Sequence, residues 1–536
     1  MRRTWLPAAG LVLLCWATLV HAAAEVGPAT ARRAAIVVTT LADVQAVDGE
    51  CSLREAILNA NGDNCAGSTD CACGAGHDTI TFSIAGTIPL SSPLPAVEGP
   101  EPLSIIGPAG GLTLDGGGAH QILEVSYQSG LTVENLTLMG GRGGSGAAIV
   151  NRGTLLLRHC TLADNHADRR GGAIHAMGPS TTAEGCQFSD NRADGAGGGG
   201  AIYASGGLRL AHCQFDGNRA AESGGAISCY GRLTISDCRF SNNHAEGYSG
   251  GAINVLGATT IADSAFVGNH AGSNGGAVQV VAGGSLAMTR CGLRDNHADD
   301  GGGALLAYGG PIEATNCSFL ENQGRVGGAI GAYHAITAAH CTFAGNSGLY
   351  GGHLYVAEEV SAALINAILA PTVSGDSGFG AVSDGGNNID SGHSAGFGDE
   401  RGSLTGTDPL LEALGADALW LAPLPGSPAI DGVTWNAPNG CPATDQRGYS
   451  RDGTCDIGAI EAGGTLPTAT PTATASPTPT RSPTASPTAS RTATASITPT
   501  ATRTATLAGT HTPTRTSTGA ARRLWLPVVL RLAAGP

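Results

Sequence analysis

The sequence predicts an all-β protein whose centre, from about residue 100 to about residue 370, is a right-handed parallel β-helix. Three observations support this fold class: two short motifs recur in register, the repeat is about 26 residues long, and the apolar runs between the motifs are too short for helices. The motif Cys-x-(Phe/Leu)-x-x-Asn occurs eight times between Cys160 and Asn346, with Ser264 in the place of one cysteine. Gly-Gly-Ala-Ile, or a near variant, lies between successive copies.

Each repeat is expected to form one coil of three short strands, because glycine and asparagine separate its apolar runs. Stacked coils place equivalent residues about 4.8 Å apart, so each column of residues has one structural role. We expect the Phe/Leu and Ile columns to fill the interior. The cysteine column is expected to consist of buried thiols, because parallel in-register side chains miss the disulfide dihedral angle; a metal or disulfide ladder is the alternative.

An asparagine ends each copy of the first motif. We expect this column where a strand passes into a turn, because asparagine tolerates left-handed backbone geometry and stacked amides can hydrogen-bond along the helix. The members of this structural ladder are Asn165, Asn191, Asn218, Asn243, Asn269, Asn296, Asn322 and Asn346.

The alternation of Gly-Gly-Ala-Ile with Phe-x-x-Asn over about residues 144–355 resembles the repeat of the polymorphic outer membrane protein family. Two motifs that recur in register eight times make this resemblance specific. It implies a β-helical adhesin, and the solenoid is similar to those of pectin-lyase-like proteins.

Residues 1–24 are typical of a secretory signal peptide, with Arg2 and Arg3 before a short apolar run and Ala22-Ala23-Ala24 as a cleavage site. No later segment has the run of about 18 apolar residues expected of a membrane helix. We therefore expect a secreted or cell-surface protein of the cell envelope, with the outer membrane as one location.

Residues 35–80 are expected to cap the first coil. Ser52 and Glu55 predict a capping box at the start of a helix whose apolar stripe includes Leu53 and Ile57. This stretch resembles the domain named for its Cys-Ser-Leu-Arg-Glu-Ala motif, found at the start of exported repeat proteins. An oxidising compartment favours two disulfides over a zinc site, with the pairing left open, among Cys51, Cys65, Cys71 and Cys73.

The β-helix is expected over residues 81–370 and a second cap over residues 371–464. Three short motifs between Gly426 and Glu461 resemble the choice-of-anchor domain that closes many such proteins. Cys441 and Cys455 are disulfide candidates there. We expect Asp445, Arg447 and Asp456 to form a structural polar network rather than a catalytic cluster.

Residues 465–519 consist mainly of Thr, Pro, Ala and Ser, which predicts a disordered low-complexity linker or stalk. The short apolar tail at residues 520–536 is either an attachment signal or a passive end.

Composition excludes several functions. The chain has no lysine, so Schiff-base chemistry and phosphate-loop lysines are absent, and its net charge of −15 argues against nucleic acid as a partner. No catalytic, cofactor-binding or metal residues are expected. His244, His270 and His297 follow ladder asparagines on consecutive coils, but Arg192 and Arg219 hold the same position, which favours an exposed cationic column over a metal site. Calcium at Asp-Gly-rich turns such as 299–302 is a weaker alternative.

Tyr230, Tyr308 and Tyr333 each lie three residues after the Ile or Leu of the glycine motif, and we expect them to point outward as candidates for stacking on sugar rings. The leading hypothesis is a monomeric, non-enzymatic adhesin or envelope protein that binds surface glycans or matrix or cell-surface proteins. The alternative is a carbohydrate-active enzyme of the pectin-lyase-like class, a polysaccharide lyase or glycoside hydrolase. Such an enzyme should interrupt the repeat with an Asp/Arg/His cluster in a groove.

Overall fold

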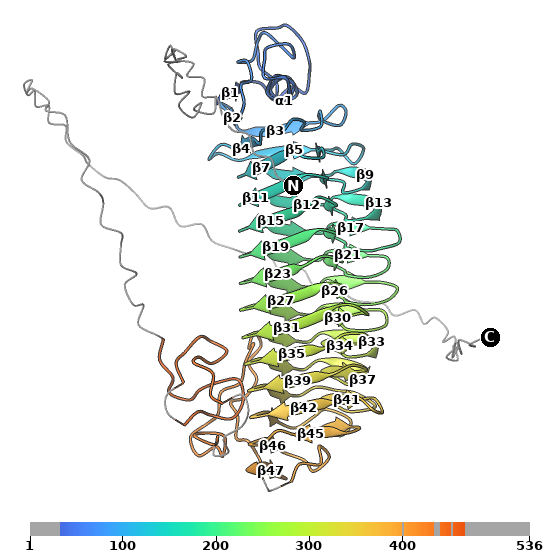
Figure 1. The fold of residues 1–536 in the computed structure, drawn as a ribbon, viewed down its shortest axis with the longest axis vertical. Helices are drawn as coiled ribbons and strands as arrows, with labels where there is room; N and C mark the ends of the chain where they lie inside the picture. The colour runs from blue at the N-terminus through green and yellow to red at the C-terminus, as the bar shows by residue number, and fades with distance from the viewer. Residues whose placement is uncertain (1–32, 399–400, 434–439, 452–453, 467–536) are drawn as a thin grey trace, which may run out of the picture. The chain divides into compact units, whose positions relative to one another are not determined.

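The computed structural model describes residues 33–398, 401–433, 440–451 and 454–466, which form a right-handed parallel β-helix (Figure 1). Its strands stack into four parallel sheets, A to D, of 14, 14, 11 and 8 strands. The expected signal peptide, nearly all of the Thr/Pro-rich linker and the apolar tail lie outside the described residues. Sheet A runs from β1 (Ala35–Val38) to β45 (Val382–Asp384), and sheet B from β3 (Gly86–Pro89) to β47 (Leu404–Thr405). Sheet C runs from β6 (Leu123–Val125) to β44 (Gly378–Phe379), and sheet D from β9 (Arg142–Ser145) to β37 (Gln323–Val326).

Each central coil has four strands, not the three that the apolar runs predicted. The strands of one coil, in the order of sheets C, A, B and D, are β14 (Ile174–Ala176), β15 (Ser180–Glu184), β16 (Gln187–Ser189) and β17 (Arg192–Ala193). The fourth strand directly follows the ladder asparagine. Its only inward side chain is an alanine, such as Ala193, between the polar residues Arg192 and Asp194, so it contains no apolar run that would reveal it.

The Phe/Leu column forms a stack inside sheet B. The rings of Phe188, Phe215, Phe240 and Phe266 lie 4.5 to 4.8 Å apart between centroids and within 6° of parallel. This spacing matches the distance between neighbouring strands, so each ring packs on the equivalent ring of the next coil. Burial of these apolar columns is the main contribution to the stability of the helix.

The ladder asparagines are fully buried and satisfy one another's hydrogen bonds. Asn243 Oδ1 accepts from the backbone N–H and from Nδ2 of Asn218, at 3.1 and 2.9 Å. Asn243 Nδ2 donates to Oδ1 of Asn269 at 2.9 Å and to the Phe215 carbonyl at 3.0 Å. The same amide-to-amide bond joins every neighbouring pair from Asn165 to Asn346.

The left-handed conformation expected of the ladder asparagines was wrong. It belongs to the residue before each of them, as at Asp164 (φ 53°) and Asn242 (φ 55°), and these side chains are exposed. The left-handed residue makes the turn, which leaves the next side chain free to point inward. A buried amide ladder and a solvent-exposed turn therefore occupy adjacent columns.

His353 ends the ladder. Its Nδ1 accepts a hydrogen bond from Asn346 Nδ2 at 3.0 Å, and its Nε2 donates to the Ala370 carbonyl at 2.6 Å. Burial lowers the pKa of His353 to about 4, so the ring is neutral at neutral pH. Protonation would turn Nδ1 from an acceptor into a donor facing the donor Asn346 Nδ2.

At the N-terminal end of the stack lies helix α1 (Leu53–Gly62), as expected of a cap (Figure 1). The capping box is present, because the Ser52 side chain accepts from Glu55 N and the Glu55 carboxylate accepts from Ser52 N. The helix residues Leu53, Ala56 and Ile57 belong to the main core. The apolar face of α1 therefore covers the open N-terminal end of the β-helix.

The stack extends beyond residues 81–370. Strands β1 and β2 (Thr79–Phe82), which lie mostly in the expected N-terminal cap, pair in sheet A, and β44 to β47 continue three sheets past residue 370. At the far end, Ala395 and Phe397 close the main core.

The C-terminal lobe, residues 406–466, packs against the side of the last coils and not over the end of the helix (Figure 1). Leu320 and Ala344 of sheet B point outward and are apolar, whereas the coil before them carries Arg294 in this column. The lobe covers them with Leu421 and Ile457. The lobe thus buries two consecutive outward apolar residues of sheet B.

Replacing Asn243 by Ala is expected to lower the free energy of unfolding by about 3 kcal/mol or more, because each buried group that loses its partner costs about 1–3 kcal/mol. Urea unfolding measures this change. Asn242→Gly is the matched control, since glycine accepts the left-handed geometry of this exposed neighbour; we expect an effect below about 1 kcal/mol. Equal losses in the two variants would contradict the role of the ladder.

His353 makes the fold sensitive to acid. The pKa of histidine is about 6.5 in an unfolded chain and about 4 for folded His353. Between these values the unfolded state binds more protons, so stability decreases as the pH falls. We expect Tm to decrease across this window, with a smaller slope for His353→Gln. The exposed control His334→Gln should keep the wild-type slope of Tm against pH. An unchanged slope for His353→Gln would argue against His353 as a source of the acid sensitivity.

Candidate functional site

The three tyrosines singled out by the repeat are exposed, but they do not form one strip. Between Tyr230 and Tyr308 the equivalent positions hold Leu256 and Val281. Tyr230 instead contacts Tyr203, with ring centroids 5.3 Å apart, and Tyr308 contacts Tyr333, at 6.1 Å. The tyrosines therefore belong to two separate clusters.

The first cluster is already covered by a cation. The Arg170 guanidinium lies 4.7 Å from the centroid of the Tyr203 ring and donates to its hydroxyl at 3.1 Å. Tyr203 itself is buried. Burial, together with Arg170 and Arg152, lowers the pKa of the neighbouring His175 to about 4. Tyr203 is thus closed off by packing, and the ring of Tyr230, which is 44% exposed, is the part of this cluster that stays open to solvent.

The second cluster is larger and more open, and we call it the aromatic patch: Tyr308, Tyr333, Tyr350, Tyr355 and Phe379. Tyr333 and Tyr355 lie 5.6 Å apart between ring centroids, as do Tyr355 and Phe379, whose rings are within 11° of parallel. Tyr350 meets the Phe379 ring edge-on at 5.7 Å. The exposed fraction of Tyr308 is 60% and that of Phe379 is 46%. The patch crosses four consecutive strands of sheet C: β34 (Leu305–Ala307), β38 (Ile330–Ala332), β41 (Leu354–Val356) and β44.

Three members of this patch do not share the repeat position from which Tyr308 and Tyr333 were predicted. Tyr355 is the middle residue of β41, and its register partner in β44 is Phe379, so both occupy a different column from Tyr308 and Tyr333. Tyr350 lies in the turn before β41. Phe379 falls beyond residue 370, where the periodicity fades.

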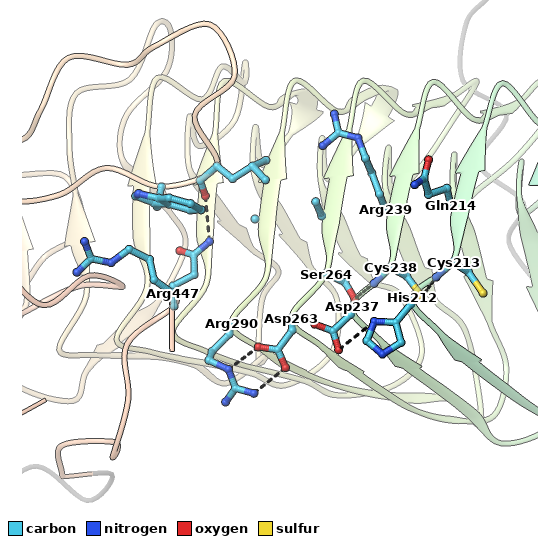
Figure 2. Close-up of a pocket in the computed structure, with 15 residues that line it drawn as sticks. His212, Cys213, Gln214, Asp237, Cys238, Arg239, Asp263, Ser264, Arg290 and Arg447 are labelled. Atoms are coloured by element: carbon cyan, nitrogen blue, oxygen red, sulfur yellow. Dashed lines mark hydrogen bonds and ion pairs between the residues drawn. The ribbon is translucent and has the colours of Figure 1, made fainter. Parts of the chain in front are cut away.

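A groove of about 480 Å³ lies between sheet B and the C-terminal lobe (Figure 2). Its floor carries His212, Asp237, Asp263 and Arg290 from consecutive coils, and Trp420 of the lobe lines the other side. Arg290 donates to both Asp263 oxygens, at 2.6 and 2.7 Å. The groove thus combines an indole, the Asp263–Arg290 ion pair and a second carboxylate, that of Asp237, beside His212.

The charged residues of this groove do not interrupt the repeat. Asp237 and Asp263 occupy the left-handed turn position before the cysteine column, with φ of 51° and 52°. The same position holds Asn316 and His340 in other coils. Asp263 is engaged by Arg290, while Asp237 lies 4.0 Å from His212 and is half exposed. These are ordinary turn residues that the lobe has enclosed on one side.

The histidine column lies on the outer face of sheet D. His244, His270 and His297 begin β25 (His244–Ala245), β29 (His270–Ala271) and β33 (His297–Gly301) and stand in register. Arg192 and Arg219 hold this column earlier, as the sequence indicated. Burial and the neighbouring His270 and Arg219 lower the pKa of His244.

The six candidate cysteines form three disulfides in the structure: Cys51–Cys71, Cys65–Cys73 and Cys441–Cys455. The first two hold the loop beside α1, and the third lies within the C-terminal lobe. The repeat cysteines are buried and unpaired, together with Cys229.

The carboxylates in the polar cluster of the lobe are occupied by internal hydrogen bonds. Asp445 accepts two side-chain hydrogen bonds from Arg447, at 2.7 and 2.9 Å, and backbone bonds from Arg447, Tyr449 and Glu461. The buried Arg451, which the sequence did not single out, joins Glu461 to Asn316 of the β-helix. Because its carboxylates are occupied, this network fits a structural role.

We expect the eight described free thiols to be unreactive toward a thiol reagent in the native state and fully reactive in denaturant. Burial blocks access to all eight thiols, and it raises the pKa of the Cys229 thiol to about 11. Thiol titration of the chain without residues 1–24, before and after unfolding, measures this. A native-state count above one would contradict the packing role.

Comparison with known proteins supports the fold and leaves the ligand open. None of the helices in the described part of the chain is long and apolar enough to cross a bilayer. No curated protein matches the chain. A family model described as the right-handed β-helix region matches residues 121–291, which contain the first five complete coils of the ladder.

Proposed function

We propose that this chain is an exported, surface-displayed β-helix protein that binds carbohydrate through the aromatic patch without changing it chemically. The observation that carries the proposal is the exposure of several neighbouring aromatic rings on consecutive coils. Contact between large aromatic side chains and water is unfavourable, and burial against a partner removes it. A contiguous exposed aromatic patch therefore marks an interaction site. In this patch Tyr308 is the most exposed ring.

The shape of the patch suits a linear saccharide. Neighbouring rings lie 5.6 to 6.1 Å apart and are repeated by the coil stack, so a chain lying parallel to the helix axis would meet aromatic surface at each coil. Tyrosine combines an apolar face for the C–H surface of a sugar with a hydroxyl for hydrogen bonding. The pKa of Tyr333 is raised, mainly by burial, so its hydroxyl stays protonated.

Export and surface display rest on the sequence. The support comes from the signal-like residues 1–24, the three disulfides and the Thr/Pro-rich stretch at 465–519. The resemblances to polymorphic outer membrane repeats, to the Cys-Ser-Leu-Arg-Glu-Ala domain and to the choice-of-anchor domain point the same way. Matrix or cell-surface glycoproteins would present suitable glycans.

A carbohydrate-active enzyme is the second candidate, because the groove beside the lobe places Asp237, Asp263 and Trp420 around one space. A glycosidase needs two carboxylates with separate roles. Here Asp263 is held by Arg290, and both carboxylates belong to repeated turn positions. This arrangement favours binding over catalysis.

Screening of the purified protein on a glycan array, followed by titration with the best ligand, tests the proposal. We expect Tyr355→Ala to weaken binding about five- to thirtyfold, since the lost ring–sugar contact and the lost packing of its neighbours cost roughly 1–2 kcal/mol. Tyr248→Ala, at an exposed tyrosine outside the patch, should bind like the wild type. Equal binding by both variants would place the glycan elsewhere.

Polysaccharide depolymerisation, measured on the same samples, separates the two candidates. We expect no shortening of any bound polysaccharide. Chain cleavage that Asp237→Asn abolishes would replace the binding proposal by the enzymatic one.

A further inference from the structure

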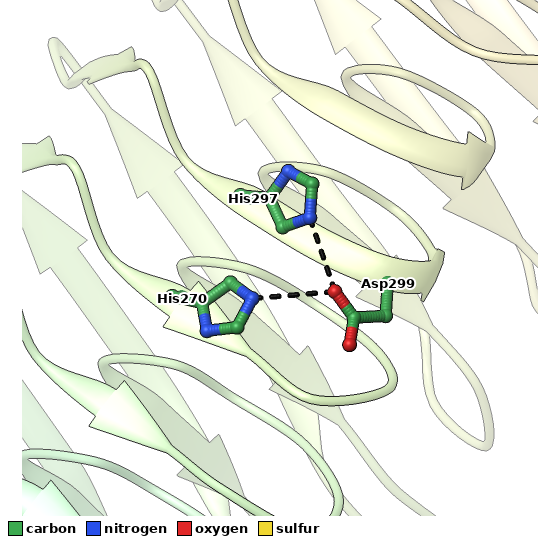
Figure 3. Close-up of side chains that lie close together, drawn as sticks. All are labelled: His270, His297 and Asp299. Atoms are coloured by element: carbon green, nitrogen blue, oxygen red, sulfur yellow. Dashed lines mark hydrogen bonds and ion pairs between the residues drawn. The ribbon is translucent and has the colours of Figure 1, made fainter. Parts of the chain in front are cut away.

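Two histidines and one aspartate converge on the outer face of sheet D (Figure 3). His270 Nε2 lies 3.3 Å from Asp299 Oδ1, and His297 Nε2 lies 3.1 Å from the same oxygen. All three ligand atoms fall within 4.8 Å of one another. All three side chains are partly exposed, so an ion from solution could reach them.

The stacking of the coils produces this convergence. His270 and His297 are register partners in β29 and β33, and Asp299 lies two residues after His297, on the same face of its strand. The position equivalent to Asp299 in the preceding coil is Gly272, which has no side chain. The carboxylate of Asp299 reaches both imidazoles, one in its own coil and one in the preceding coil.

A third histidine orients one of the two rings. His244 Nδ1 lies 3.2 Å from His270 Nδ1, so one of these nitrogens donates to the other. When His270 Nδ1–H is the donor, the lone pair of its Nε2 points toward His297 and Asp299. Metal-binding histidines commonly use their second nitrogen in this way.

We propose that His270, His297 and Asp299 bind one zinc ion, with a remaining coordination position open to water or to an oxygen of a ligand. Two imidazole nitrogens and one carboxylate are a typical donor set for zinc, whereas calcium and magnesium prefer oxygen alone. Zinc–ligand bonds are about 2.0–2.2 Å long, so neighbouring ligand atoms lie about 3.3 Å apart around the ion. The two N···O separations already match this spacing.

The same sheet contains a matched pair that should not bind zinc. His166 Nε2 contacts Asp194, but no second histidine faces this pair. Arg142 lies 2.7 Å from the other ring nitrogen of His166, and Arg192 engages Asp194. Two guanidinium groups at this position oppose a further cation.

The test is zinc titration of the full chain, prepared without a polyhistidine tag, by isothermal calorimetry. We expect one zinc ion per chain, at least tenfold weaker binding for His297→Gln and for Asp299→Asn, and unchanged binding for His166→Gln. Glutamine occurs naturally in this column at Gln323, so the coil should accept the substitution.

Binding of cobalt(II) gives a second, optical readout that does not depend on the heat of binding. A tetrahedral d–d absorption should develop in the wild type and in His166→Gln but not in His297→Gln, and matched circular dichroism spectra would show that all variants are folded. The proposal is overturned if the wild type binds no zinc, if His297→Gln binds as tightly as the wild type, or if His166→Gln loses the site.

Discussion

The in-register stacking of parallel coils is the constraint on which the rest of this structure depends. It gives every residue the same neighbours one coil above and one coil below, at the strand spacing. Phenylalanine therefore packs on phenylalanine, and each ladder amide bonds to the next amide. A buried amide would be costly alone, but in the column each donor and acceptor has a partner. The polar ladder thereby holds the register that the apolar columns need.

The repeated part of the fold could be predicted because repetition reveals columns. The interior phenylalanines, the buried cysteines, the asparagine ladder and the capping box of α1 all have fixed sequence spacing. The fourth strand was missed because a single inward alanine carries no signal. The left-handed turn was assigned one residue too late, since both Asn243 and the preceding Asn242 suit turns and only the structure separates the buried from the exposed side chain.

The candidate sites were predicted less well because they depend on neighbours in different columns. Tyr308 and Tyr333 were identified from their shared position, but Tyr355 and Phe379 join them from another column. Asp299 meets histidines of two successive coils, and the preceding coil has a glycine in its equivalent place. The groove requires the lobe, which docks against the side of the coils and buries outward apolar residues such as Leu320. Distinctive surfaces therefore occur where the repeat varies.

The amide ladder also has a direction. Each Oδ1 accepts from the coil before it, and each Nδ2 donates one of its hydrogens to the next member of the ladder, so the bonds between ladder members run one way from Gly141 N–H to His353. A gene duplication that inserts a whole repeat between Asn165 and Asn346 leaves this chain of bonds unbroken, because any amide can follow any other. His353, the final acceptor, is not interchangeable with the amides in this way. The ladder therefore sets no limit on the number of coils between its first amide and the terminating histidine.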